Sequence, residues 1–207
     1  MNMPPRGLYA ITQTDHKTAA QVLAEVHAAL KGGAVLVQYR DKNPHDAVAL
    51  ATALVALCHQ FNVPLLINDA VDLALQVGAD GVHLGQDDGD IAAARQRLGP
   101  DAIIGVSCYN SVERALSAAQ QGASYVAFGR FFSSQSKPLA APAQLDTLHR
   151  AKATLTLPIV AIGGILPDNG GALLAAGADL LAVIGGLFDQ EPETAARAFQ
   201  TLFTATA

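Results

Sequence analysis

The sequence predicts a single-domain α/β protein, 1–207, folded as a closed (β/α)8 barrel of the TIM-barrel type. Short apolar runs rich in β-branched residues alternate eight times with longer segments rich in alanine and leucine. A Gly-Ala pair recurs at 33–34, 78–79, 122–123 and 177–178, where glycine can end a helix in a left-handed conformation before the next strand. The intervals are 45 residues (33 to 78), 44 (78 to 122) and 55 (122 to 177), so each covers two βα units, the last with about ten extra residues.

The predicted strands are short apolar runs of the kind that a parallel sheet buries on both faces. In chain order they lie at 8–12, 34–39, 64–68, 81–84, 103–107, 125–129, 158–162 and 180–184. The predicted helices are the longer segments between them, with alanine and leucine at helical spacing. They lie at 18–30, 44–61, 71–77, 91–98, 111–121, 143–153, 167–176 and 192–203.

Two features refine this reading of the elements. Asp90 is a plausible N-cap for the helix at 91–98. The segment 130–142 has neither helical nor strand periodicity, contains serines and two prolines, and follows a strand end, so we interpret it as an active-site loop or lid. An open doubly wound sheet is the alternative architecture, but it explains the repeat less well, and no Gly-x-Gly-x-x-Gly follows the first strand.

Composition narrows the functional classes. The chain is 51% hydrophobic and 15% charged, which is typical of a compact α/β enzyme, and its net charge of -5 without a basic run argues against a nucleic-acid partner. Cys58 and Cys108 form no Cys-x-x-Cys pair, which favours a reduced, cytoplasmic setting. The N-terminus lacks a signal-peptide core, and the apolar stretch 155–188 is interrupted by prolines, aspartates and glycines. We expect small-molecule substrates, no membrane partner and a possible homo-oligomer.

Three polar side chains alternate at the end of the second predicted strand. Gln38, Arg40 and Lys42 are spaced two residues apart, so a strand would point all three to one side of its carboxyl end. An amide and two cations aimed together at the mouth of a buried sheet need an anionic or strongly polar ligand to offset their desolvation. The pattern predicts a site that handles phosphate.

Carboxylates follow the next two predicted strands. Asn68 and Asp69 end the third strand, where they suit a helix N-cap and a functional role equally well. Asp87 and Asp88 follow the fourth strand and have no evident structural duty, because Asp90 already caps the next helix. Carboxylates from two adjacent strand ends could converge on one hard cation, and Mg2+ is the natural candidate.

Glycine pairs and a hydroxyl-rich loop complete the predicted site. Residues 163–164 and 185–186 are Gly-Gly and close the seventh and eighth strands, where barrels commonly bind phosphate through backbone N–H groups. The lid contributes Ser134, Ser136 and Lys137, which could bind a second anion, although such a loop is more often merely solvated.

The remaining polar and sulfur-bearing residues receive structural interpretations. His83 lies inside the fourth strand and is expected to be a polar member of the barrel interior, while Cys58 belongs to the core. Cys108 has no partner base visible in the sequence, so a nucleophilic role is not favoured. Ser107, which closes the fifth strand, is the better candidate for hydrogen bonding to a ligand.

Taken in order, these segments resemble the thiamine-phosphate synthase family over nearly the whole chain. The segments that carry the resemblance are 38–42 (Gln-Tyr-Arg-Asp-Lys), 67–69 (Ile-Asn-Asp), 81–88 (Gly-Val-His-Leu-Gly-Gln-Asp-Asp), 105–107 (Gly-Val-Ser), the loop that ends in Lys137, and 161–165 (Ala-Ile-Gly-Gly-Ile).

The resemblance implies a (β/α)8 enzyme that joins hydroxymethylpyrimidine diphosphate to thiazole phosphate, giving thiamine monophosphate and diphosphate. It implies that Asp69 and Asp88 hold magnesium, and that Ser107 sits beside the reacting pyrimidine. Backbone groups of Gly164, Ile184 and Gly185 would bind the thiazole phosphate. The implied ligands of the pyrimidine diphosphate are Gln38, Arg40, Lys42, Asn68, Ser134, Ser136 and Lys137.

The physical chemistry of this reaction suits the residues. Diphosphate departs from an electron-poor benzylic-type carbon, so catalysis consists mainly of stabilising the departing charge with Mg2+, Arg40, Lys42 and Lys137 while the thiazole nitrogen is positioned. The attacking nitrogen carries no proton, so no general base is required.

The chain also departs from the family pattern. The loop at 129–137 lacks two usual prolines and has serine in place of both threonines, and Gly185 stands where a serine is usual. Tyr109 stands where the family often has histidine. These changes bear on rate and substrate preference more than on fold.

Two rival functions follow from the resemblance. One is a thiazole tautomerase of the TenI type. The chain keeps Arg40, Lys42, Asp69, Asp88 and Lys137, the residues implied to hold the diphosphate and magnesium, and this argues against a tautomerase. The other is a non-catalytic thiazole-phosphate-binding paralogue with a degraded lid, which would not need magnesium.

Overall fold

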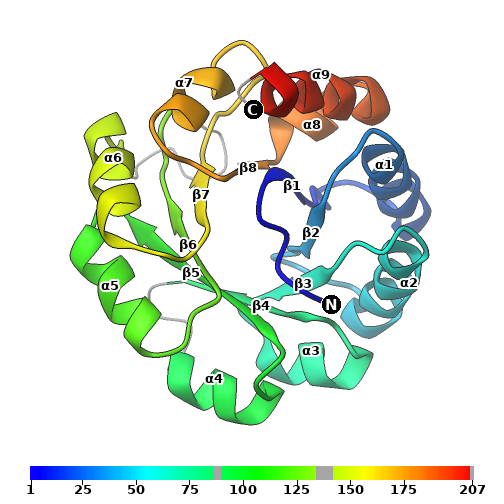
Figure 1. Cartoon of the computed structure of the whole chain (residues 1–207). Helices are drawn as coiled ribbons and strands as arrows, with labels where there is room; N and C mark the ends of the chain where they lie inside the picture. The colour runs from blue at the N-terminus through cyan, green and yellow to red at the C-terminus, as the bar shows by residue number, and fades with distance from the viewer. Residues whose placement is uncertain (86–89, 134–141, 206–207) are drawn as a thin grey trace.

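The strands form a closed barrel in which each strand pairs in parallel with the next along the chain and the eighth pairs with the first (Figure 1). This closed parallel barrel confirms the predicted (β/α)8 fold. The computed structural model describes residues 1–85, 90–133 and 142–205. The strands are β1 (Gly7–Ile11), β2 (Leu36–Tyr39), β3 (Leu65–Asn68), β4 (Gly81–Leu84), β5 (Ile103–Tyr109), β6 (Tyr125–Phe128), β7 (Ile159–Ile162) and β8 (Leu180–Val183).

Helices surround the barrel, one after each strand and a second after β8 (Figure 1). They are α1 (Ala19–Lys31), α2 (Ala47–Gln60), α3 (Val71–Val77), α4 (Ile91–Leu98), α5 (Val112–Gln120), α6 (Leu145–Thr154), α7 (Gly170–Ala175), α8 (Gly185–Phe188) and α9 (Pro192–Ala205).

The predicted elements lie within about three residues of their observed bounds, and three differences have a clear physical reason. The helix α7 begins at Gly170 instead of 167, because the Asn169 side chain accepts a hydrogen bond from the Leu166 N–H and holds the preceding residues in a turn. The short helix α8 was not predicted, since its four residues are too few to show helical periodicity. The strand β5 runs on to Tyr109 through a bulge between Ser107 and Tyr109, which re-aims the end of this strand.

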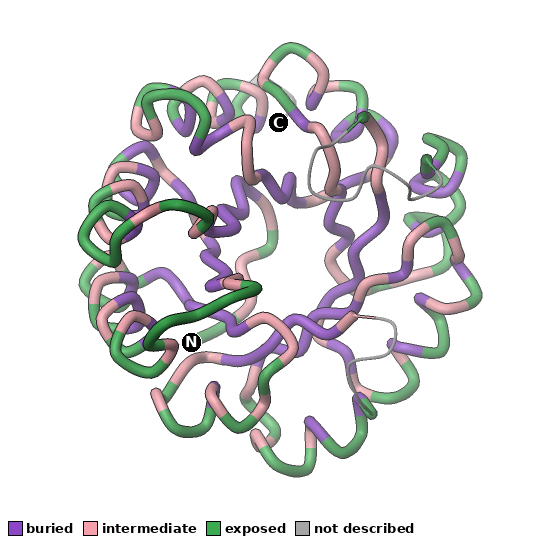
Figure 2. Tube along the Cα trace, turned by 180° about the vertical axis from the view of Figure 1, so that it is seen from behind, coloured by how far each residue is buried: buried purple, intermediate pink, exposed green. Residues whose placement is uncertain are grey.

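The core has two layers that the barrel wall separates. One layer fills the barrel and the other packs the outer face of the sheet against the helices. Figure 2 shows buried backbone along the strands and exposed positions along the outer helices. The residues that fill the barrel are Tyr9, Ile11, Leu36, Leu66, Ile103, Tyr125, Ala127, Val160, Leu180 and Ala182.

The helix caps settle the role of several sequence features. Asp90 accepts hydrogen bonds from the backbone of Ala92 and Ala93, as predicted for the cap of α4. The four repeated glycines all have positive φ, from +68° at Gly78 to +111° at Gly177, which confirms their turn role. Ala70 is the N-cap of α3 and provides no side-chain hydrogen bond. The polar pair Asn68 and Asp69 is therefore not used as a helix cap.

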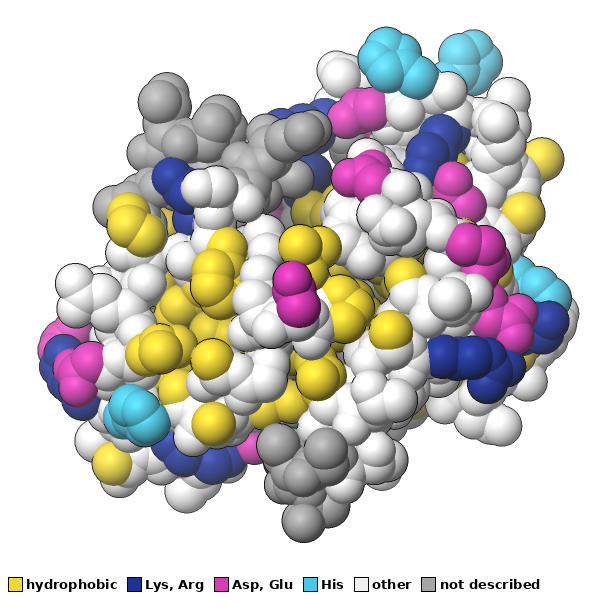
Figure 3. Space-filling model, turned by 90° about the horizontal axis from the view of Figure 1, so that it is seen from above, with side chains coloured by type: hydrophobic (Ala, Val, Ile, Leu, Met, Phe, Trp, Pro, Cys, Tyr) yellow, Lys and Arg dark blue, Asp and Glu magenta, His cyan; other side chains and the backbone are white. Residues whose placement is uncertain are grey.

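The surface of the barrel mixes apolar and charged side chains. None of the helices in the described ranges has the length and apolar character needed to cross a membrane. On the face above α7 and α9, apolar side chains gather in the middle and most charged side chains lie toward the edges (Figure 3). Leu166, which is 42% exposed, contributes to the apolar surface of the protein.

Both cysteines are free, fully buried thiols, and this burial has a consequence for stability at alkaline pH. Burial raises the pKa of Cys58 and of Cys108 to about 12 from an ordinary value of 9.0. The unfolded chain therefore releases these protons first, and stability is full below about pH 9 and falls as the pH rises toward 12. We expect each thiol to lower the free energy of unfolding by about 1.4 kcal/mol per pH unit above pH 9.

Urea titrations between pH 8 and pH 10 measure this slope. The double variant Cys58→Ala/Cys108→Ala should show a shallower dependence on pH than the native chain. Equal slopes for the two proteins would contradict the assignment of the alkaline instability to the thiols.

Candidate active site

Two cavities adjoin at the carboxyl ends of the strands. The first, here called the deep cavity, has a volume of about 360 Å3 and extends from the barrel interior to the loops after β6, β7 and β8. The second, here called the polar cavity, lies over the ends of β2, β3 and β4. The residues that line both cavities are Arg40, Asn68, His83, Ser107 and Tyr109. This shared wall makes the two cavities parts of one site.

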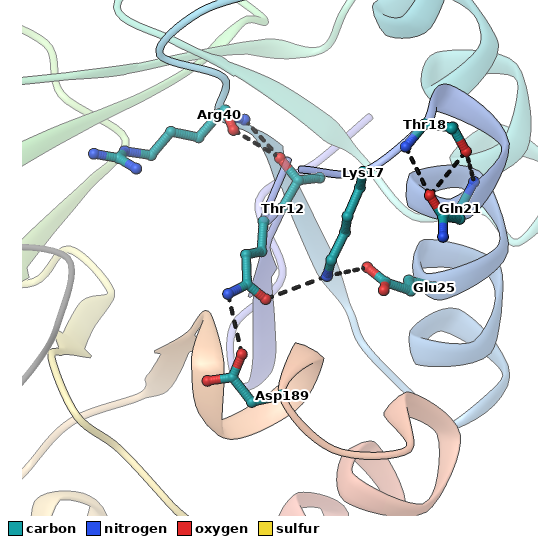
Figure 4. Close-up of polar contacts among 8 residues, drawn as sticks. Thr12, Lys17, Thr18, Gln21, Glu25, Arg40 and Asp189 are labelled. Atoms are coloured by element: carbon teal, nitrogen blue, oxygen red, sulfur yellow. Dashed lines mark hydrogen bonds and ion pairs between the residues drawn. The ribbon is translucent and has the colours of Figure 1, made fainter. Parts of the chain in front are cut away.

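The side chain of Arg40 is held in place through its backbone. The Thr12 hydroxyl donates to the Arg40 carbonyl at 3.1 Å and accepts from the Arg40 N–H at 2.9 Å (Figure 4). Thr12 is only 2% exposed, so this clamp is shielded from water. It fixes the chain just beyond the end of β2, at the point where Arg40 reaches both cavities.

The predicted alternation of Gln38, Arg40 and Lys42 holds for the first two residues. Gln38 and Arg40 both line the deep cavity, as residues two apart along an extended segment should, although Arg40 lies just beyond the end of β2. Lys42 lies beyond the end of β2 and lines only the polar cavity, which also contains Asp41 and Asp69. Of the two cationic side chains, Lys42 therefore serves the polar cavity alone, and Arg40 lies at the junction of the two cavities.

Asp69 connects the ends of β3 and β4. One carboxylate oxygen accepts from the Gly85 N–H at 3.2 Å, and the other accepts from the Asn68 amide. Its backbone is left-handed, with φ of +62°, a conformation that aspartate and asparagine tolerate better than most residues. The local backbone therefore turns the Asp69 carboxylate into the polar cavity instead of toward α3.

The chemistry of the polar cavity fits Mg2+. Among the described residues, no group of three or more histidines, cysteines and carboxylates forms a ready-made metal cage. Mg2+ does not need one, because it commonly binds one or two carboxylates and takes its remaining ligands from water and substrate phosphate. Asp69 supplies such a carboxylate. The second predicted ligand, Asp88, lies outside the described residues, as do Ser134, Ser136 and Lys137.

The glycine pairs line the deep cavity and are also required by packing. A Cβ on Gly164 would lie 2.3 Å from the Ser133 carbonyl oxygen, and one on Gly186 would lie 2.3 Å from the Ile165 carbonyl oxygen. The loops after β6, β7 and β8 therefore approach one another closely enough to exclude side chains. Gly163, Gly164, Ile184 and Gly185 all border the deep cavity, so their backbone is available to a ligand.

Arg130 is a functional candidate that sequence reasoning left undecided. It lines the deep cavity beside Gly163, where an added Cβ would lie 2.3 Å from the Arg130 Cβ. Its guanidinium donates to the Phe132 carbonyl at 3.4 Å, which directs it along the loop after β6. Among the described residues that line this cavity, the permanently charged cations are Arg40 and Arg130.

A polar network fixes the turn after α8. The Gln13 amide donates to Asp189 at 3.0 Å, and Lys17 donates to both Gln13 and Glu25, at 3.2 and 2.8 Å (Figure 4). Asp189 lies against Gly185, where a Cβ would be 2.5 Å from its Oδ2. The side chain beside Gly185 is therefore an acceptor, at the position where the family that the chain resembles usually has a serine.

A continuous chain of polar side chains crosses the barrel interior. The Gln38 amide donates to the Tyr9 hydroxyl at 2.6 Å, and the hydroxyls of Tyr9 and Tyr125 are 2.8 Å apart. His83 contacts the Tyr125 hydroxyl through Nδ1 at 2.8 Å and Ser107 Oγ through Nε2 at 2.9 Å. This arrangement confirms His83 as a polar member of the interior.

The sequence analysis did not identify Tyr9 and Tyr125, the two tyrosines of this hydrogen-bonded network, as members of the site. A signal for them exists in Gly105, which pairs with Tyr125 across β5 and β6 and whose Cβ would lie 1.9 Å from the Tyr125 ring. A glycine inside a strand indicates close approach of another group. Cys108, by contrast, belongs to the layer between sheet and helices and does not line either cavity, so a nucleophilic role is excluded by its position.

A barrel with cations, a carboxylate and exposed backbone at its carboxyl end defines an enzyme that acts on phosphorylated small molecules. A family model described as thiamine monophosphate synthase matches residues 8–187. The chain therefore belongs to the thiamine monophosphate synthase family.

Individual relatives agree with this assignment. The chain is 52% identical to a thiamine-phosphate synthase of Marinobacter nauticus over 95% of this chain and 90% of the relative. It is 55% identical to a thiamine-phosphate synthase of Saccharophagus degradans over 87% of this chain and 85% of the relative. Its structure matches a thiamine phosphate pyrophosphorylase from Pyrococcus furiosus with a TM-score of 0.87 and 33% identity, covering 97% and 96% of the two chains.

The activity follows from these relationships. The chain is a transferase that condenses hydroxymethylpyrimidine diphosphate with thiazole phosphate to give thiamine monophosphate and diphosphate. The expected family and reaction are confirmed, and the comparisons favour the synthase over the tautomerase and the non-catalytic paralogue.

Proposed function

We propose that the condensation is magnesium-dependent and takes place at the wall shared by the deep cavity and the polar cavity. The observation that carries this proposal is that Arg40, Asn68 and Ser107 line both cavities. A reaction that joins two substrates needs a place where the leaving group of one and the nucleophile of the other reach the same carbon. The shared wall supplies that place.

The polar cavity would receive the diphosphate. Arg40 and Lys42 would contact its oxygens, and Asp69 together with Asp88 would hold Mg2+. When bound, the ion supplies positive charge to the oxygens of the leaving diphosphate. Ser134, Ser136 and Lys137 are proposed to complete the diphosphate site.

The shared wall would receive the pyrimidine. Gln38, Asn68 and Ser107 would orient the ring, while the bond from its methylene carbon to the diphosphate oxygen breaks and a bond to the thiazole nitrogen forms. No proton is transferred, because the thiazole nitrogen attacks through its lone pair. Apolar side chains such as Val160 and Ile162 line the deep cavity and would shield the electron-poor carbon from water.

The deep cavity would receive the thiazole phosphate. Backbone groups of Gly164, Ile184 and Gly185 would contact its phosphate. Arg130 borders the same cavity next to the glycine turn and would provide the positive charge for that phosphate. Arg130 would also replace the side-chain donor that is lost at Gly185, where the family usually has a serine.

Arg130→Ala is expected to raise the KM for thiazole phosphate about tenfold or more, since a hydrogen bond to a charged group is worth about 1.5–3 kcal/mol. The KM for the pyrimidine diphosphate should change less than about twofold, because Arg40 and Lys42 would serve that substrate. Steady-state kinetics with each substrate varied in turn measure both values. Arg150→Ala, on the exposed face of α6, is the control. Equal changes in both KM values would refute the assignment of Arg130 to the thiazole end.

The test of the proposed function is product formation. Purified protein supplied with both substrates and Mg2+ should form thiamine monophosphate, detected by chromatography and mass spectrometry. Thiazole isomerisation without product formation by folded protein would favour the tautomerase. Tight binding of thiazole phosphate without any turnover would favour the binding paralogue.

The cellular setting is a separate proposal. Both thiols are free and buried, which suits a reduced cytoplasm. Self-association into a homo-oligomer and the lack of a nucleic-acid partner stay predictions from the sequence, and analytical ultracentrifugation tests the first of them.

A further inference from the structure

The polar chain across the barrel interior consists of Gln38, Tyr9, Tyr125, His83 and Ser107, joined by four contacts of 2.6 to 2.9 Å. The first four residues are at most 9% exposed. Four of the five residues, Gln38, Tyr9, His83 and Ser107, also line the deep cavity, so the polar network begins and ends at the substrate site. Its two ends come from β2 and β5, on different parts of the barrel wall.

Given the orientation of the Gln38 amide, one order of protons provides an acceptor for every hydroxyl of this polar network. In this order Tyr9 accepts from the Gln38 amide and donates its own proton to the Tyr125 oxygen, because a buried hydroxyl without an acceptor is costly. The Tyr125 proton then goes to His83 Nδ1, and a neutral His83 carries its proton on Nε2 and donates to Ser107. Burial raises the pKa of both tyrosines well above 10, so each keeps its proton.

Ring packing keeps the members of the chain in register. The Tyr9 and Tyr125 rings meet edge to face, with centroids 5.9 Å apart, and the His83 ring stacks on Tyr125 at 5.7 Å. Gly105 leaves the space that the Tyr125 ring occupies. The packing of its ring therefore holds the Tyr125 hydroxyl between Tyr9 and His83.

We propose that Tyr9, Tyr125 and His83 are positioning residues, which orient Gln38 as an acceptor and Ser107 as a donor toward the pyrimidine. The Gln38 amide nitrogen donates a hydrogen bond to Tyr9, so the amide oxygen of Gln38 is presented to the cavity. Ser107 accepts from His83 and so has its own proton to donate. An aminopyrimidine has an amino donor and ring-nitrogen acceptors, which complement this pair. The inference rests on the proposed placement of the pyrimidine at the shared wall.

The first test needs no substrate. Nitrogen-15 NMR of the native protein should show His83 as the neutral tautomer protonated on Nε2, with its signals identified by their absence from His83→Gln. In Tyr125→Phe, which loses the hydroxyl and keeps the ring, the preference for this tautomer should weaken. A native His83 protonated on Nδ1, or on both nitrogens at pH 7.5, would overturn the proposed direction.

The second test measures coupling between the two ends. Gln38→Ala and Ser107→Ala should be non-additive, with a loss of pyrimidine diphosphate affinity in the double variant at least threefold smaller than the product of the single losses. In the Tyr125→Phe background the two losses should multiply. Additivity in both backgrounds would refute the coupling. Tyr39→Phe, whose hydroxyl lies on the outer face of the sheet, should leave the coupling intact.

Calorimetric binding of the pyrimidine diphosphate serves as the readout, so the coupling is measured without turnover. Failure of the proposed reaction would appear as binding without product formation in the native protein. Failure of the positioning role would appear as a His83 tautomer protonated on Nδ1, or as additive losses for Gln38→Ala and Ser107→Ala in both the native and the Tyr125→Phe backgrounds. Either result would count against the positioning role whichever reaction the protein performs.

Discussion

Asp69→Asn is expected to lower kcat roughly 10²–10³-fold while leaving the barrel folded, as expected for loss of a group that stabilises transition-state charge. Asparagine tolerates the left-handed backbone at this position, where φ is +62°, and its side-chain oxygen can still accept from the Gly85 N–H. The substitution therefore removes the negative charge and the acceptor of the Asn68 amide, and it preserves the shape of the side chain. Kinetics at increasing Mg2+ concentrations measure the loss and should show a raised requirement for the metal.

Asp72→Asn is the matched control for this change. Asp72 lies three residues further along the chain, on α3, where it pairs with Arg97 at the surface. Its loss should leave kcat and the magnesium requirement unchanged. A native-like rate for Asp69→Asn, with an unaltered response to Mg2+, would refute the assignment of Asp69 as a metal ligand.

Arg40→Ala is expected to reduce kcat/KM for the pyrimidine diphosphate roughly 10²–10³-fold. Arg40 is the cation at the junction of the two cavities, where charge develops on the departing diphosphate. Arg40→Lys should recover only part of the activity, because an ammonium group cannot reproduce the two parallel hydrogen bonds of a guanidinium. Steady-state kinetics with both variants measure these effects.

The Thr12 clamp offers an internal check on this prediction. Thr12→Val keeps the shape of the side chain and removes both hydrogen bonds to the Arg40 backbone. It should give a smaller loss than Arg40→Ala, because the guanidinium stays but is less well placed. Activity of Arg40→Ala within threefold of the native value would contradict the role of this arginine.

Much of the fold could be predicted from sequence because its signals are local. Eight apolar runs, the glycines with positive φ and the Asp90 cap each act within one βα unit. The helix α8 escaped prediction because four residues are too few for a period, and the start of α7 was misplaced because a side-chain contact of Asn169 decides it. Local patterns do not record such contacts.

The candidate site, like the fold, contains residues that the sequence indicated and residues that it did not. Arg40, Asp69 and Ser107 stood out because polar groups at strand ends are conspicuous, and the structure brings them to one place. Tyr9 and Tyr125 did not stand out, since tyrosine is common in strands and their contact links residues 116 positions apart. Arg130 could not be placed because the loop after β6 has no periodicity from which to infer a direction.

In the proposed reaction, two substrates meet at the shared wall with help from Mg2+. Diphosphate release by the purified protein tests this most directly, measured with both substrates and Mg2+, with EDTA, and with thiazole phosphate omitted. We predict release only when both substrates and the metal are present, and recovery when Mg2+ is returned after EDTA. Release that proceeds equally in EDTA, or equally without thiazole phosphate, would contradict the proposal.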